Sequence, residues 1–546
     1  MAPRFAALLC MAALILLTHG NLASAAKGVD VVKTESGRVQ GTLNADHTVR
    51  MFKGVPFAAP PVGELRWKPP QPALSWKGVR DASKFGPPCL QTDVYGDIYF
   101  RDAEPSEDCL NLDIWMPAKP ATAKLPVLLW YYGGGFVAGS ASEARYDGEN
   151  LAKKGIMVVS PDYRLGIFGF FSHPELTQES EHKASGNYGL LDQVAALHWV
   201  VKNIAAFGGN PGNITIAGES AGSFSVSALM ASPLSRGLFQ KAIGESGAFF
   251  PDRVGEGLSA RLRSETEKVG VQFAASLGMN SLAQMRAMPG DKLLQAAAEA
   301  TKEYRFSPNI DGYFLPADVQ SIYAGGEQSQ VPLLAGWNAD EGKMGVLLEP
   351  HLPTVQSFAE EAHRRFGGRA DEFLKLYPAT TDEEAVLSAE ALAGDDFIAF
   401  STWKWINMQL ETGHSPVYEY HFEQVPAVKP GAKIGQVPAS EAGSTHACEI
   451  QYVFQTLKSL DVPWTEDDFK VSGVMSSYWA NFVKNGNPNG EGLPEWPVYN
   501  AQTGFQVIRL SGKDTHAAPE AHRARYEFLD AQAARARESA AGGSLR

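Results

Sequence analysis

The sequence predicts an α/β protein with a large, mostly parallel central sheet, helices on both faces of the sheet, and helical insertions that form a gorge. Three observations lead to this fold class. Short runs rich in β-branched residues alternate with stretches of helical periodicity, as in parallel strands joined by helices. Several of these runs are apolar throughout, as in a sheet covered on both sides. A G-E-S-A-G segment at residues 218–222 lies where one such strand meets a helix.

The elements follow from these patterns in chain order. An antiparallel hairpin is expected over residues 29–43, with Gly37 at its turn. Strand character occurs at residues 127–132, 156–159, 214–217, 242–246, 331–337, 416–422 and 506–510. Helical character occurs at residues 190–206 and 473–483. The stretches 250–330 and 345–415 are rich in helical patterns and are expected to wall the substrate gorge.

The N-terminus has the pattern of a cleaved signal peptide. Arg4 precedes a short apolar run at residues 5–17, and A-S-A at residues 23–25 offers a cleavage site, with Ala26 as the neighbouring option. The alternative, a membrane anchor, requires a longer apolar run. We therefore expect residues 1–25 to be removed and the protein to be exported to the periplasm or the exterior, with no stable membrane span left.

Composition narrows the classes of partner and site. No Pro/Gly/Ser-rich linker divides residues 26–546, so we expect one domain. The net charge of −13 repels phosphate backbones and argues against nucleic-acid binding. Export makes a disulfide possible, and one between Cys89 and Cys109 would close a loop of about 20 residues worth about 3 kcal/mol, leaving Cys448. No cysteine or histidine cluster has zinc spacing, so no metal site is expected.

The G-E-S-A-G segment is the most informative part of the chain. The β-branched run 214–217 enters it, and residues 221–230 leave it with helical character. A serine on such a tight strand-to-helix turn projects its hydroxyl group out of the backbone, and the flanking glycines leave room for the turn. An ordinary Gly/Ser turn is the alternative, but the flanking elements favour Ser220 as a nucleophile.

A serine nucleophile also requires N–H donors that stabilise the developing oxyanion. Three glycines at residues 133–135 follow the predicted strand that ends at Tyr132. Such a segment can curl and present free N–H groups, although a flexible turn is the alternative. The N–H group of Ala221, directly after the serine, would be a third donor.

The hydroxyl group further requires a base and a carboxylate that orients the base. Of the twelve histidines, His446 is favoured because it lies in a small-residue loop, 443–448, and follows the serine and the acid in chain order. The acid is expected in the loop after the strand 331–337, where the pattern leaves Asp340 and Glu341 equally open.

Longer motifs carry a resemblance to a known family. The chain resembles the type-B carboxylesterase/lipase family of the α/β-hydrolase fold, which includes the cholinesterases, over nearly its whole length. The matching motifs are F-G-G-N-P at 207–211 followed by I-T-I-A-G-E-S-A-G at 214–222, S-E-D-C-L-N-L at 106–112, Y-R-L-G at 163–166 and N-Y-G-L-L-D-Q at 187–193.

The resemblance implies a role for individual residues. The implied triad is Ser220 as nucleophile, Glu341 as acid and His446 as base. The implied oxyanion hole is Gly134, Gly135 and Ala221. Ser246 would contact the acid, and Glu219 would support the triad from beside the nucleophile. The chemistry implied in this way uses no metal or organic cofactor.

The resemblance also implies a disulfide between Cys89 and Cys109, and the chain departs from the family at several positions. Ala447 stands where a glycine is usual after the histidine, and Glu245 stands where a glutamine is usual. Cys448 is expected to be a buried free thiol, with a redox-sensitive thiol as the alternative. The loop between the paired cysteines lacks the tryptophan that binds choline in cholinesterases, so choline esters are not expected as substrates.

These points predict an exported serine carboxylesterase that acts on small-molecule esters through a Ser-His-Glu acyl-enzyme. The segment before residues 307–312 is expected to approach the acyl pocket and contains Lys302, Tyr304 and Arg305. The positive charges of Lys302 and Arg305 suggest substrates that are bulky or carboxylate-bearing esters, such as xenobiotics or fumonisin-type toxins. The alternative is that these two side chains point to solvent. A non-catalytic adhesion protein of this family would lack the nucleophile or the base, and this chain has both.

Overall fold

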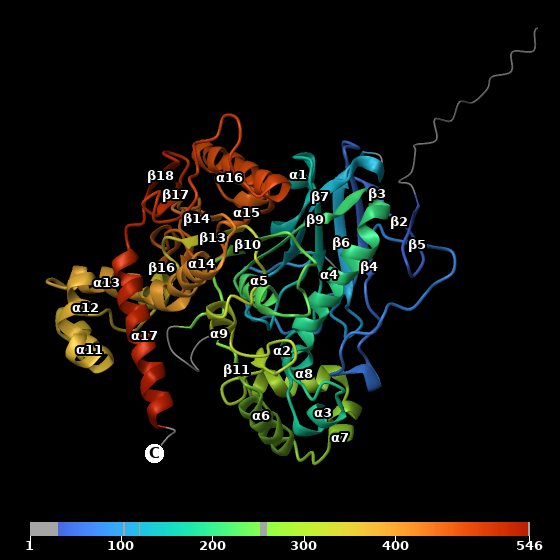
Figure 1. Cartoon of the computed structure of the whole chain (residues 1–546), viewed down its shortest axis with the longest axis horizontal. Coiled ribbons are helices and arrows are strands. Elements are labelled where there is room, and N and C mark those ends of the chain that lie inside the picture. The colour runs from blue at the N-terminus through green and yellow to red at the C-terminus, as the bar shows by residue number, and fades with distance from the viewer. Residues whose placement is uncertain (1–30, 102–103, 120, 252–258, 544–546) are drawn as a thin grey trace, which may run out of the picture.

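An eleven-stranded sheet forms the centre of the computed structural model, which describes residues 31–101, 104–119, 121–251 and 259–543 (Figure 1). From one edge to the other, the strands are β18 (His516–Pro519), β17 (Gln506–Leu510), β14 (Val417–Phe422), β13 (Leu333–Asn338), β10 (Lys241–Glu245), β9 (Gly209–Glu219), β7 (Leu125–Tyr131), β8 (Met157–Pro161), β6 (Asn111–Pro117), β4 (Val49–Pro56) and β3 (Thr42–Leu43). The predicted signal peptide, residues 1–25, lies outside the described residues.

The sheet is parallel in its middle and antiparallel at its edges. Neighbouring strands pair in parallel across the middle of the sheet, in the order β8, β7, β9, β10, β13, β14 and β17. The outer strands β18, β6, β4 and β3 pair antiparallel. The predicted fold class is therefore confirmed. The antiparallel pair β4 and β6 was not predicted, because β6 is buried along its whole length and shows no alternating pattern.

Helices cover both faces of the sheet. Helices α4 (Tyr188–Phe207) and α5 (Ala221–Ala231) lie on one face, and α16 (Glu466–Asn485) lies on the other (Figure 1). The predicted helical excursions contain α6 (Arg263–Ser276), α7 (Leu282–Ala287), α8 (Gly290–Glu299), α11 (Val355–Phe366), α12 (Ala370–Leu376) and α13 (Asp382–Gly394). Among the described residues, no helix has the length and apolar character needed to cross a bilayer.

The N-terminal hairpin is shorter than expected. β1 (Val32–Lys33) pairs antiparallel with β2 (Arg38–Gln40), so Gly37 lies in the turn as predicted. These strands form a separate small sheet with β5 (Val79–Asp81), and the chain joins the central sheet only at β3.

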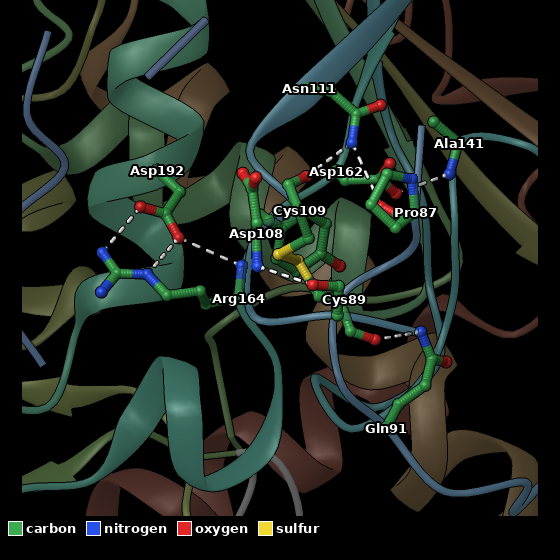
Figure 2. The surroundings of a disulfide bond; sticks show 12 residues. Pro87, Cys89, Gln91, Asp108, Cys109, Asn111, Ala141, Asp162, Arg164 and Asp192 are labelled. Atoms are coloured by element: carbon green, nitrogen blue, oxygen red, sulfur yellow. Dashed lines mark hydrogen bonds and ion pairs between the residues drawn. A yellow bond between two sulfur atoms is a disulfide. The ribbon is translucent and has the colours of Figure 1, made fainter. Parts of the chain in front are cut away.

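Three of the sequence motifs meet around a disulfide bond (Figure 2). Cys89 and Cys109 are bonded, with their Cα atoms 4.9 Å apart. The guanidinium group of Arg164 donates two hydrogen bonds of 2.8 Å to the carboxylate of Asp192, and both side chains are buried. The amide of Asn111 donates to the carbonyl oxygen of Cys109 at 2.9 Å. The Arg164–Asp192 pair connects the segment after β8 to helix α4, and the N–H group of Asp162 donates to the carbonyl oxygen of Asn111 at 2.9 Å, which connects the same segment to the start of β6. Three motifs that are separate in sequence therefore meet in space.

Candidate active site

Ser220 lies on the turn between β9 and α5, as the sequence predicts. Its backbone has φ 52° and ψ −123°, a conformation that L-residues rarely adopt and that is typical of functional sites. A Cβ atom at Gly222 would lie 1.9 Å from the carbonyl oxygen of Tyr131, and one at Gly218 would lie 2.5 Å from the carbonyl carbon of Gly222. Both glycines are therefore required for the close approach of α5 to the sheet.

The structure brings Ser220 together with two residues far away in sequence. The Nε2 atom of His446 is 2.9 Å from Oγ of Ser220, and its Nδ1 atom is 2.6 Å from Oε2 of Glu341. Asp340, the other acid that the strand pattern left open, instead accepts a hydrogen bond of 2.8 Å from the N–H group of Ser444. Asp340 therefore holds the loop that carries the histidine, and Glu341 contacts the imidazole.

The carboxylate of Glu341 is buried, and both of its oxygen atoms make hydrogen bonds. Its Oε1 atom accepts hydrogen bonds from the hydroxyl group of Ser246 at 2.7 Å and from the N–H group of Asn338 at 3.0 Å. The amide of Asn338 donates to a second buried carboxylate, Glu449, at 2.6 Å. A buried charge is tolerated when such donors replace its lost hydration. The position of Ser246 agrees with its expected contact to the acid.

Two buried carboxyl groups next to the triad influence the imidazole. Oε1 of Glu219 lies 3.3 Å from Nε2 of His446. Burial raises the pKa of Glu219 to about 8, and the positive charge of His446 opposes this rise. Burial lowers the pKa of His446, but the negative charges of Glu341 and then Glu219 outweigh it, so the net shift is upward. Burial also raises the pKa of Glu449 to about 7.

Two departures from the family pattern have a structural explanation. Glu245 is completely buried, and its Oε1 atom accepts a hydrogen bond of 2.6 Å from the indole of Trp479. Burial raises its pKa well above the usual value and so favours the neutral carboxyl form, which resembles a glutamine side chain. Ala447 has φ 64°, in the region that favours glycine, and its backbone strain is on the order of 1 kcal/mol.

The glycine segment and the start of α5 present backbone donors beside Ser220. Gly134 and Gly135 have φ 101° and 62°, and both line the cavity that contains Ser220. The helical hydrogen bonds of α5 begin with the bond from the N–H group of Phe224 to the carbonyl oxygen of Ser220, at 2.9 Å. The N–H group of Ala221 precedes this ladder and remains available to a ligand.

A cavity of about 730 Å³ opens over these groups. Ser220 and His446 lie in its lining, together with Tyr304 and Arg305 of the predicted substrate segment. Both Lys302 and Arg305 are exposed, but Lys302 lies outside this lining, contrary to the expectation for this residue. Among the described residues, no group of three or more His, Cys, Asp or Glu side chains is arranged to hold a metal ion.

Sequence reasoning missed one residue beside the imidazole. Phe397 lines the cavity, and its ring packs edge-on against His446 with the ring centres 5.0 Å apart. It lies in a π-helical turn, Asp395–Ala399, inserted between α13 and α14 (Phe400–Thr412). Such π-turns are frequent at functional sites, but the sequence pattern here is that of a continuous helix and does not indicate one.

In any reaction in which His446 accepts a proton from Ser220, the imidazole must be neutral, and this requirement generates a pH prediction. Glu219 ionises at about pH 8, below the pKa of about 10 that the charges of Glu341 and Glu219 give to His446, so its negative charge is present in the range where the imidazole loses its proton. Glu219→Gln removes that charge and lowers the pKa of His446. We expect the acidic limb of a kcat/KM–pH profile to move to lower pH by about one unit.

Glu245→Gln is the matched control, because it makes the same change at a buried carboxyl group that accepts a hydrogen bond from Trp479 and does not contact the imidazole. Its acidic limb should coincide with that of the unmodified protein. An unchanged limb in Glu219→Gln would contradict an electrostatic effect of Glu219 on the histidine.

Comparisons with known proteins agree with this geometry. A profile of the carboxylesterase family matches residues 28–529. The chain is 37% identical to a fumonisin B1 esterase of Sphingopyxis macrogoltabida, over 85% of this chain and 84% of that protein. It is 33% identical to the para-nitrobenzyl esterase of Bacillus subtilis, over 90% and 97% of the two chains. A PNB esterase of known structure superposes with a TM-score of 0.78 at 31% identity, over 92% of this chain and 99% of the other. The chain therefore belongs to the carboxylesterase family and is a carboxylic ester hydrolase with the α/β-hydrolase fold.

Proposed function

We propose that this carboxylesterase hydrolyses its substrates through an acyl-enzyme formed on Ser220, with His446 as base and Glu341 as the acid that orients it. The observation that supports this proposal is the continuous hydrogen-bonded path from Oγ of Ser220 through the imidazole to the buried carboxylate, at 2.9 and 2.6 Å. The same cavity contains the serine, the histidine and the glycine donors.

In this mechanism, the imidazole removes the proton of Ser220 as Oγ attacks the ester carbonyl carbon. The N–H groups of Gly134, Gly135 and Ala221 stabilise the oxyanion. The imidazolium, stabilised by Glu341, then protonates the departing alcohol. In the second half of the reaction, His446 activates water, which releases the carboxylic acid and regenerates the serine.

The nucleophile is tested by Ser220→Ala. We expect kcat on a simple aryl ester to fall by about 10⁴-fold or more, because no covalent intermediate can form. A fluorophosphonate probe should label the folded wild-type protein at Ser220 and should label neither the variant nor the unfolded wild-type protein. Folded wild-type protein that stays unlabelled at Ser220 would contradict the mechanism and favour a non-catalytic binding role.

A second candidate concerns the substrate. We propose that the enzyme favours esters whose acyl group carries an additional carboxylate, as in fumonisin-type esters. Arg305 supports this, because it lines the same cavity as Ser220. The similarity to a fumonisin B1 esterase supports the same substrate class.

Arg305→Ala tests this preference, and Lys302→Ala is the control, since Lys302 lies three positions away and outside the cavity lining. We expect Arg305→Ala to lower kcat/KM on a carboxylated ester about tenfold and to leave a neutral ester of equal size nearly unchanged, because only the first makes a charge-assisted hydrogen bond. Lys302→Ala should affect neither ester. Equal losses on both esters would remove the basis for the proposal.

We also propose that the protein is exported by a cleaved N-terminal segment. The disulfide between Cys89 and Cys109 supports export, because such bonds persist in oxidising compartments. N-terminal sequencing of protein from the periplasm or the culture medium should begin at Ala26 or the next residue. Active protein that retains Met1 in the cytoplasm would argue against it.

A further inference from the structure

One cavity residue lies close to the oxyanion-hole segment and has no role in the mechanism above. Tyr95 belongs to the loop between Cys89 and Cys109, and this loop forms one wall of the cavity. A Cβ atom placed on Gly135 would lie 2.8 Å from the hydroxyl oxygen of Tyr95. The phenol group therefore covers the glycine that is proposed to bind the oxyanion.

Two restraints fix this loop relative to the glycine segment. The disulfide closes the base of the loop, and the amide of Gln91 donates to the carbonyl oxygen of Cys89 at 3.0 Å (Figure 2). The same amide group pairs with the backbone of Gly139, donating at 2.9 Å and accepting at 2.7 Å. Gly139 lies four positions after Gly135, so these hydrogen bonds attach the start of the loop that carries Tyr95 to the chain just beyond the oxyanion segment.

The hydroxyl group of Tyr95 is available as a donor. Among the residues that the structure describes, none accepts a hydrogen bond from it. Burial raises its pKa above the usual 10, against the opposing charge of Arg305, so the phenol keeps its proton throughout the range in which an esterase works. The residue is 40% exposed and lines the cavity that contains Ser220.

The distances allow one substrate oxygen to contact both groups. A backbone nitrogen lies about 2.5 Å from its own Cβ position, so the Tyr95 oxygen is within roughly 5.3 Å of the Gly135 nitrogen. A single oxygen at about 2.9 Å from each donor can therefore accept hydrogen bonds from both.

We propose that Tyr95 is a further catalytic residue, whose hydroxyl group donates a hydrogen bond to the ester carbonyl oxygen as it becomes negatively charged. This inference rests on the proposed acyl-enzyme mechanism, in which Gly134, Gly135 and Ala221 bind the same oxygen. The hydrogen bond from this side chain becomes stronger as negative charge develops on the oxygen. It therefore stabilises the transition state more than it stabilises the bound ester.

Tyr95→Phe removes only the hydroxyl group and tests the proposal. We expect kcat/KM on an aryl ester to fall by about tenfold to a hundredfold, the loss typical of one hydrogen bond to a charged group. A trifluoromethyl ketone, which adds to the serine and forms an oxyanion, should lose affinity by the same factor. The corresponding isostere, in which a methylene group replaces the ester carbonyl group, forms no oxyanion and should keep its affinity. This separation would not arise if Tyr95 only shaped the cavity.

Tyr99→Phe is the matched control, because Tyr99 lies on the same loop, is 65% exposed and is outside the cavity lining. It should behave as the wild-type protein does. Complete fluorophosphonate labelling of Tyr95→Phe at Ser220 would show that its fold and nucleophile are intact. With labelling retained, unchanged kinetics, or equal losses for the ketone and the isostere, would overturn the role of Tyr95. Failure of labelling in the wild-type protein would instead overturn the mechanism itself.

Discussion

The contact between the imidazole of His446 and the buried carboxylate of Glu341 is the interaction on which the rest of the site depends. Removing a carboxylate from water is costly, and the cost is offset here by the imidazole, the hydroxyl group of Ser246 and the N–H group of Asn338. Each of these donors comes from a different turn of the chain or a different strand end. The buried charge of Glu341 is therefore stabilised only when the sheet is assembled. The same assembly orients His446 toward Ser220.

Parallel strands explain how residues so distant in sequence meet. Ser220 and His446 are 226 positions apart, yet Ser220 follows β9 directly and the acid follows β13 by one short turn. Ser246 follows β10, which lies between these two strands. The carboxyl ends of parallel neighbours lie at one edge of a sheet, so each turn adds a group to the same place. The antiparallel outer strands extend the sheet and contribute none of these groups.

The departures from the family pattern show how much this arrangement tolerates. Glu245 adds a carboxyl group close to other buried acids, but burial favours its neutral form and Trp479 donates a hydrogen bond to it. Ala447 adopts a left-handed backbone conformation beside the histidine, at a cost that a well-packed domain absorbs. In both cases the hydrogen bonds from Ser220 through His446 to Glu341 are present beside the altered residue.

Local patterns in the sequence determined the strand-turn-helix around Ser220, most of the parallel strands and the glycine segment, since each depends on neighbouring residues. Local patterns did not decide between Asp340 and Glu341, because both residues follow the same strand. The two differ only in the residues from distant parts of the chain that their side chains contact. The tertiary structure also decided that Arg305 but not Lys302 lines the cavity, and that Phe397 and Tyr95 lie beside the reacting groups. These positions depend on how loops pack against one another, and a one-dimensional pattern carries no information on that packing.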